Sequence, residues 1–306
     1  MATPLKDPEI LAYIARSENF YPPDCVDFPV EEQRRYYDAL CADFRQARPA
    51  GVSVSEESLP GPAGPMAARR YRPPEQRHRA LLVYLHGGGF ILGSLDSHDD
   101  VCAELCARVG LEVVALDYRL CPEHPHPAPF EDALAAFRLL AAEGRPVILG
   151  GDSAGGNLAA AVAMASRDEA VKPKGQLLIY PALGGDEISE SYESEGDAPM
   201  LTRADIDYYT GIHAGGGGFR DDPTFAPLAA RSYQGLPPAA IFVAEIDPLR
   251  DDGLHYAERL NAAGIEAEFS LEEQLVHGYL RARSMSARAK AAFTRICEGL
   301  ERLASA

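Results

Sequence analysis

The feature that most constrains the fold is a recurrence of short apolar runs separated by helix-length stretches. The runs are rich in Val, Ile and Leu and occupy residues 80–85, 111–116, 146–149, 176–180, 239–244 and 266–271. Stretches with helical periodicity lie between most of them, at 97–109, 130–142, 154–167 and 249–262. Repeated strand–helix–strand units require right-handed crossovers and produce a mostly parallel sheet with helices on both faces. The pattern therefore predicts an α/β fold.

Two segments stand outside this rhythm. Residues 1–50 are amphipathic and helical, notably at 30–48, and a loop-rich stretch containing LPGPAGP follows them. Residues 183–218 are acidic and glycine-rich, with one helical piece at 202–212. This second segment interrupts two core strands, which predicts an insertion above the carboxyl edge of the sheet, where α/β folds bind ligands. We expect residues 1–50 and the insertion to form a helical cap on a catalytic domain of residues 51–306.

The charge balance excludes several classes of partner. Acidic residues outnumber basic residues by 46 to 29, which gives a formal net charge of −17. This charge repels phosphate backbones and anionic membrane surfaces, so we expect no nucleic-acid partner. No apolar run approaches the roughly 20 residues that a membrane span needs. A broadly anionic substrate is also disfavoured unless a local pocket overrides the global field.

The cysteines and the N-terminus bear on compartment and cofactors. The six cysteines contain no C-x-x-C pair. Cys102 and Cys106 would share a helix face, but no histidine pair at metal-binding spacing lies near them, so we interpret them as buried thiols. The N-terminal residues include acids and prolines and lack an apolar signal core. We therefore expect a cytoplasmic protein with no metal and no cofactor.

The strongest local motif is GDSAG at residues 151–155. It fits G-x-S-x-G, it follows an apolar strand, and it precedes an alanine-rich helix. In such a motif the serine occupies a strained strand-to-helix turn, which exposes its hydroxyl at the positive end of a helix. Ser153 is therefore the predicted nucleophile.

A second motif, HGGGF at residues 86–90, follows the strand at 80–85. Consecutive glycines leave backbone N–H groups open to a carbonyl oxygen, and acyl transfer needs such donors for its oxyanion. A phosphate cradle is disfavoured because the lysine and further glycines of nucleotide motifs are missing. Gly87 and Gly88, together with the N–H of Ala154, are the predicted donors. We interpret His86 as a structural residue of this loop.

The base and the acid should follow Ser153 in the order acid, then histidine. Asp247 comes directly after the strand at 239–244, and His277 comes after the last strand-like run. The histidine would accept the serine proton, and the aspartate would orient the imidazole and stabilise its charged form. Glu245, Asp251 and Asp252 compete for the role of the acid. Asp247 is favoured because the strand end should hold Glu245 and the next helix should hold the other two.

Taken together, these motifs resemble the hormone-sensitive-lipase-like family of bacterial esterases. The resemblance extends over residues 71–279 and rests on HGGGF (86–90), DYRLCPE (117–123), GDSAGG (151–156), DPLRD (247–251) and HG (277–278). It implies an α/β-hydrolase fold with a cap, a triad of Ser153, Asp247 and His277, and oxyanion donors at Gly87, Gly88 and Ala154. The chain departs from the family pattern at EQLV (273–276), where a Pro or Gly turn is usual, and at Tyr279, where Phe is common.

The resemblance also implies hydrolysis of small, short-chain carboxylic esters through an acyl-serine intermediate. Two alternatives stay open, namely a receptor-like module that binds small molecules without turnover and an amide hydrolase. Such receptors lack the histidine, and here His277 is present, which favours an enzyme. Phe90, Tyr208 and Tyr209 are candidates for narrowing the substrate pocket. A homodimer is common in the family, so the resemblance makes a second copy of the chain a candidate partner, although no sequence feature demonstrates it.

Overall fold

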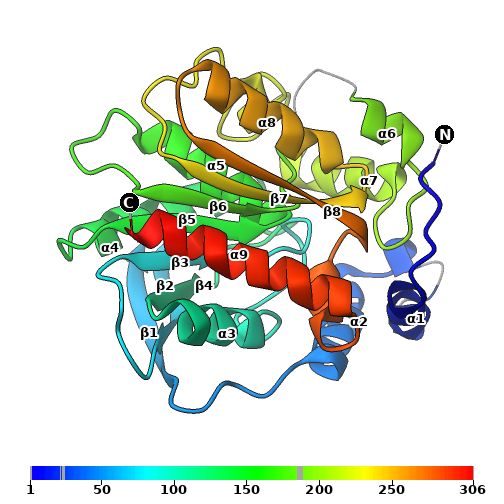
Figure 1. The fold of residues 1–306 in the computed structure, drawn as a ribbon. Helices are drawn as coiled ribbons and strands as arrows, with labels where there is room; N and C mark the ends of the chain where they lie inside the picture. Colours follow the sequence, from blue (N-terminus) through cyan, green and yellow to red (C-terminus); the bar gives the residue numbers. More distant parts are fainter. Residues whose placement is uncertain (1, 21, 23–24, 185–188, 306) are drawn as a thin grey trace.

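The computed structural model describes residues 2–20, 22, 25–184 and 189–305, and a single eight-stranded sheet organises this part of the chain (Figure 1). The strands are β1 (Ser53–Gly61), β2 (Gly64–Arg72), β3 (Leu81–Leu85), β4 (Glu112–Leu116), β5 (Val147–Asp152), β6 (Gly175–Ile179), β7 (Ala239–Ile246) and β8 (Ala267–Val276). Their spatial order is β1-β2-β4-β3-β5-β6-β7-β8. Strands β3 to β8 are parallel, and they coincide with the six predicted runs. The predicted α/β class is confirmed.

Helices cover both faces of the sheet. Helices α3 (Asp99–Val109) and α9 (Ala287–Ser305) lie on one face, and α4 (Ala128–Ala141), α5 (Ala154–Ser166) and α8 (Arg250–Ala262) lie on the other (Figure 1). Successive side chains of a strand point to opposite faces. In β3, Tyr84 packs with the first group and Leu85 with the second, and neither side chain is exposed. Burial on both sides explains why the central strands are continuously apolar.

The stretch predicted as loop-rich contains the β1–β2 hairpin, so that prediction was wrong. The turn falls at residues 62–63, inside the LPGPAGP run. Charged pairs stabilise the hairpin, since Arg69 bonds Glu56 at 2.6 Å and Arg70 bonds Glu57 at 2.8 Å. Charged side chains on an edge strand discourage pairing with another chain, but they hide the strand from a search for apolar periodicity.

Strand β8 is longer than predicted and ends immediately before His277. Its register with β7 shifts between Ala244 and Ile246, and Gln274 adopts a left-handed backbone with φ of 59°. The backbone N–H of Gln274 donates to Glu245 at the end of β7. This irregularity occupies the EQLV segment where a Pro or Gly turn was expected, and it delivers His277 to the carboxyl edge of the sheet.

The N-terminal segment (residues 2–50) and the inserted segment (residues 183–218) lie at this same edge (Figure 1). Their helices are α1 (Pro8–Ser17), η1 (Cys25–Asp27), α2 (Val30–Phe44), α6 (Glu190–Ser194) and α7 (Arg203–Ala214), while the short helices η2 (Pro227–Ala229) and η3 (Tyr279–Ser284) follow later. Thr3 bonds Glu195 through its N–H and its hydroxyl, which joins the two segments. Residues 1, 21, 23–24 and 185–188 of the predicted cap lie outside the described residues.

Helix α2 ends at Phe44, four residues before the predicted end. The residues that follow bond the start of α3 instead of continuing the helix. The Gln46 N–H donates to Asp100, and Arg48 forms an ion pair with Asp99 at 2.8 Å. These tertiary contacts outweigh the local helical pattern. Among the described residues, no helix has the length and apolarity needed to cross a bilayer.

Candidate active site

Ser153 occupies a sharp turn between β5 and α5. Its backbone has φ of 54° and ψ of −119°, a conformation that costs a non-glycine residue energy and is held here by the surrounding structure. The turn packs against the end of β3 so closely that a Cβ at Gly151 would lie 2.2 Å from the Leu85 carbonyl oxygen, and one at Gly155 would lie 1.8 Å from it. Both motif glycines are therefore required by close approach of backbone to backbone.

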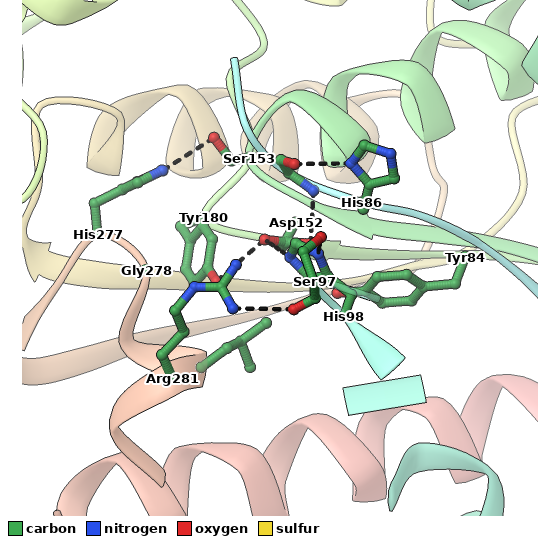
Figure 2. Close-up of polar contacts among 12 residues, drawn as sticks. Tyr84, His86, Ser97, His98, Asp152, Ser153, Tyr180, His277, Gly278 and Arg281 are labelled. Carbon is green, nitrogen blue, oxygen red and sulfur yellow. Dashed lines mark hydrogen bonds and ion pairs between the residues drawn. The ribbon is translucent and has the colours of Figure 1, made fainter. Parts of the chain in front are cut away.

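The structure brings Ser153, His277 and Asp247 into one hydrogen-bonded chain. His277 Nε2 lies 2.9 Å from Ser153 Oγ, and His277 Nδ1 lies 2.7 Å from Asp247 Oδ2 (Figure 2 shows the serine–histidine contact). Asp247 is fully buried, and its other oxygen accepts the Leu249 N–H at 2.9 Å. Because a carboxylate only accepts, the imidazole proton resides on Nδ1, and Nε2 is left to accept the serine proton.

The competing acids are engaged elsewhere. Glu245 accepts the Gln274 N–H at 2.7 Å, as expected for a residue still within β7. Asp251 accepts the Ser191 N–H at 2.8 Å. Asp252 accepts two backbone N–H groups at the start of the inserted segment. Asp247 is thus the acid whose carboxylate contacts His277.

Of the three predicted oxyanion donors, Gly88 and Ala154 are available and Gly87 is not. The Gly87 N–H donates to Asp152 Oδ1 at 3.0 Å, so this group is already occupied. Gly88 and Gly89 line the same cavity as Ser153, with φ of 123° and 61°. Within the described ranges, no acceptor takes the N–H of Gly88, of Gly89, or of Ala154 at the start of α5. The available donor set is Gly88, Gly89 and Ala154, and the assignment of Gly87 is corrected.

Asp152 connects the serine turn to the glycine loop. The sequence motif treats it only as a variable residue, so this role was missed. Besides Gly87, its carboxylate accepts from Tyr84 at 2.8 Å, His98 at 3.2 Å and Tyr180 at 3.3 Å (Figure 2). Burial raises the pKa of this carboxyl, but the charge and hydrogen bond of His98 and the Tyr84 hydroxyl outweigh it and hold the pKa well below its usual range. Asp152 is therefore an ionised, fully buried anchor.

The same network includes two histidines. His98, at the acidic start of α3, is buried against Asp152. Burial, reinforced by the nearby His98, lowers the pKa of His86 to about 4, so His86 is neutral. Its Nδ1–H lies 2.9 Å from the Gly87 carbonyl oxygen, and its ring stacks on Tyr118 at 4.4 Å between centroids. These contacts agree with a structural role in the glycine loop.

Ser153 and His277 open into a cavity of about 450 Å³. The N-terminal segment contributes Tyr13 and Tyr37 to its wall, and the inserted segment contributes Met200 and Tyr209. The wall therefore combines residues that are far apart in the sequence, which periodicity alone does not reveal.

Of the three predicted pocket residues, only Tyr209 lines this cavity. Phe90 points away and stacks on His213, with 3.6 Å between ring centroids, beside a separate cavity of about 150 Å³. The Tyr208 hydroxyl accepts from Gln33 at 2.8 Å. The three were chosen as bulky residues that could narrow the entrance, but contacts with His213 and Gln33 direct Phe90 and Tyr208 elsewhere.

Comparison with known proteins agrees with this geometry. Residues 82–281 match the model of a family with the α/β-hydrolase fold. A carboxylic ester hydrolase, LipN of Mycobacterium tuberculosis, is 41% identical over 83% of this chain and 71% of its own length. An ethyl acetate hydrolase of Pseudomonas putida is 31% identical over 89% of each chain. The esterase of the archaeon Pyrobaculum calidifontis superposes with a TM-score of 0.91, at 31% identity over 99% of this chain and 100% of its own. The resemblance inferred from the motifs is confirmed, and the chain belongs to the α/β-hydrolase-fold family.

Proposed function

We propose that this chain is a serine carboxylesterase that hydrolyses small carboxylic esters through an acyl-Ser153 intermediate. The observation that carries the proposal is the uninterrupted hydrogen-bonded chain from Ser153 through His277 to Asp247. It lies in the same cavity as Gly88 and Gly89, whose N–H groups have no acceptor among the described residues. The relatives named as ester hydrolases support the same reaction class.

In the first half-reaction, Ser153 Oγ attacks the ester carbonyl carbon while His277 Nε2 takes its proton. The carbonyl oxygen becomes an oxyanion, and the N–H groups of Gly88, Gly89 and Ala154 are placed to donate to it. His277 then gives its proton to the alcohol oxygen as the carbon–oxygen bond breaks, and the alcohol leaves. Asp247 stabilises the imidazolium that exists between these proton transfers.

In the second half-reaction, a water molecule attacks the acyl carbon and His277 accepts its proton. The second oxyanion forms in the same donor set and collapses, which breaks the bond to Ser153 Oγ. His277 returns the proton to the serine, and the carboxylic acid leaves. Every proton transfer is thus assigned to groups of this chain and to water.

The N-terminal and inserted segments are proposed to form the cap, because residues of both line the cavity above Ser153. A volume of about 450 Å³ lies in the range of small-molecule sites, which supports a small ester as the substrate. A cytoplasmic location is proposed from buried thiols such as Cys102 and Cys106, which are typical of reducing compartments. The homodimer stays a prediction that size-exclusion chromatography with light scattering will test.

The test is hydrolysis of p-nitrophenyl acetate and butyrate by the wild type and by Ser153→Ala and His277→Ala. We expect turnover in the wild type and a loss of at least about 10³-fold in each variant. His124→Ala is the matched control, because His124 is exposed and does not line the cavity, and it should retain activity.

Two outcomes would contradict the proposal. If the wild type cleaves p-nitroanilides but not esters, the chain is an amide hydrolase. If it cleaves neither, yet binds small molecules, the receptor-like alternative replaces the enzyme. Retention of the wild-type rate by either triad variant would remove the assigned nucleophile or base.

A further inference from the structure

The cavity that holds Ser153 contains a guanidinium. Arg281 lies four residues after His277, in the short helix η3, and it is the one Lys or Arg among the described residues that line this cavity. Its side chain keeps part of its surface accessible, although it sits beneath the nucleophile within a buried polar network (Figure 2). The triad mechanism above gives this cation no task.

The contacts of Arg281 leave much of its hydrogen-bonding capacity unused. One NH1 proton is donated to the Ser97 carbonyl oxygen at 3.0 Å and one NH2 proton to the Tyr37 hydroxyl at 2.7 Å. The guanidinium also stacks over the Tyr37 ring, 5.0 Å from its centroid. A guanidinium has five N–H donors, so three have no acceptor among the described residues.

Arg281 also lacks the direct carboxylate partner that its neighbour has. Arg283 pairs with Glu104 at 2.9 Å and with Asp100. In the described part of the chain, no carboxylate oxygen lies within 4.0 Å of the Arg281 nitrogens. The nearby charge of Asp152 acts on Arg281 through space, because the Asp152 oxygens are already occupied by other donors.

An anionic ligand would complete this arrangement. Taking an arginine out of water is costly unless hydrogen bonds and an opposite charge compensate it. A carboxylate matches the planar fork of a guanidinium and forms charge-assisted hydrogen bonds with it. Glu18 and Asp197 lie at the exposed edge of the same cavity. The inner Asp152 is already held by four donors, which leaves Arg281 as the charged group of the lining that can attract an anion. That distribution suits a molecule with one carboxylate rather than a polyanion.

We propose that Arg281 is a specificity-determining residue that binds a free carboxylate of the substrate. The preferred substrates are then half-esters and related compounds, in which a carboxylate lies several bonds from the ester that Ser153 attacks. This inference rests on the proposed esterase function and narrows its substrate class. The carboxylate belongs either to the acyl part or to the alcohol part of the ester, and both satisfy the same recognition.

The experiment compares matched pairs of esters that differ in one charge. Monoethyl adipate against ethyl hexanoate places the carboxylate on the acyl part, and 4-acetoxybutyrate against butyl acetate places it on the alcohol part. Acid release is followed in a pH-stat, and kcat/KM is measured for each ester. The variants are Arg281→Met, which keeps the apolar stem, and Arg281→Lys, which keeps the charge. Arg302→Met is the matched control, because Arg302 is on the surface of α9 and pairs with Glu268 outside the cavity.

We expect the ratio of kcat/KM between charged and neutral ester to fall about 10- to 100-fold in Arg281→Met for at least one pair, as loss of a charged hydrogen bond implies. Arg281→Lys should recover part of that ratio, and Arg302→Met should leave it as in the wild type. Thermal unfolding of each variant shows whether it is folded.

An Arg281→Met variant that slows both members of each pair equally would overturn the inference, since Arg281 would then serve only to balance Asp152. If the wild type hydrolyses the neutral esters but not the charged ones, the inference about Arg281 is also overturned, while the esterase function stands. If the wild type hydrolyses none of the four esters, the proposed function itself fails.

Discussion

The carboxyl edge of the sheet and the segments that lie over it are built in different ways. Helix α5, which begins at Ala154 directly after the nucleophile, is buried along almost its whole length, whereas in α7 of the inserted segment only His213 is buried. Elements with few buried contacts open locally at lower free energy than core elements. The triad therefore lies on rigid core elements, whereas the inserted segment over it is built from elements that tolerate change.

The largest effect should come from the buried acid of the edge. Asp247→Asn would replace the acceptor of His277 Nδ1–H with an amide that also presents a donor, so the imidazole would adopt the wrong tautomer. We expect kcat to fall by about 10⁴-fold with little change in thermal stability. Steady-state hydrolysis of p-nitrophenyl butyrate measures this effect.

Glu245→Gln is the matched control for Asp247→Asn. Glu245 is at the end of the same strand, but it bonds Gln274 rather than His277. Its variant should stay within about 10-fold of the wild-type rate. Equal losses in the two variants would mean that the edge responds to any change of charge, and that Asp247 has no special role.

The contribution to folding stability of the contact between α8 and the inserted segment should depend on pH. Asp252, which is buried at the start of α8, accepts the N–H groups of Leu183 and Gly184 where the inserted segment begins. Burial, together with the charges of Asp247 and Asp251, raises its pKa to about 7 against the opposing effect of these hydrogen bonds. Between about pH 4 and pH 7 the unfolded chain loses this proton while the folded chain keeps it, so ionisation costs folding stability as the pH rises.

Asp252→Asn removes this cost. The difference in the free energy of unfolding, variant minus wild type, should rise by on the order of 2 to 4 kcal/mol between pH 4 and pH 7. Above pH 7 this difference should stay constant. Urea unfolding of both proteins at pH 5 and pH 8 measures the difference. A variant whose relative stability is the same at both pH values would show that Asp252 is ionised throughout.

A smaller loss of activity is expected at the anchor between the serine turn and the glycine loop. Asp152→Asn weakens the acceptor of the Gly87 N–H and places an amide against His98. Displacement of the neighbouring donors by a fraction of an ångström should lower kcat by about 10- to 100-fold. KM should change little, because the cavity wall is otherwise intact.

Tyr84→Phe tests whether the anchor acts through position. It removes one hydrogen bond from Asp152 and keeps both the charge and the bond to Gly87. The loss of kcat in Tyr84→Phe should be smaller than the loss in Asp152→Asn. If Tyr84→Phe is as damaging as Asp152→Asn, general destabilisation of the buried network explains both results.

The core edge was predictable from the sequence because its requirements are local. The central strands are buried on both faces, so they appear in the sequence as continuous apolar runs. The residues two positions before and after Ser153 must be glycine because the Leu85 carbonyl oxygen lies against them, so they appear as G-x-S-x-G. Asp247 and His277 follow from strand ends and chain order. Each of these signals lies within a few residues of the group that it positions.

What could not be predicted depends on contacts between distant residues. The role of Gly87 was missed because its N–H is taken by Asp152, 65 residues away. The β1–β2 hairpin was missed because ion pairs such as Arg69–Glu56 leave no apolar periodicity. Phe90 was wrongly predicted to line the cavity because its ring stacks on His213, a residue of the inserted segment.

The smallest effect should come from the segments over the edge, at Tyr209. Its ring packs against the glycine loop, since a Cβ at Gly89 would lie 2.5 Å from it, and it lines the cavity beside Ser153. Tyr209→Ala should enlarge the space near the ester, so that the ratio of kcat/KM for p-nitrophenyl octanoate to that for butyrate rises by about 2- to 10-fold. Tyr208→Ala is the matched control, because that side chain bonds Gln33 and does not line the cavity. Equal shifts in the two variants would mean that the preference for acyl chain length depends on the mobility of α7 and not on the Tyr209 ring. The contrast between the rigid sheet edge and the segments over it would then apply to whole elements rather than to single side chains.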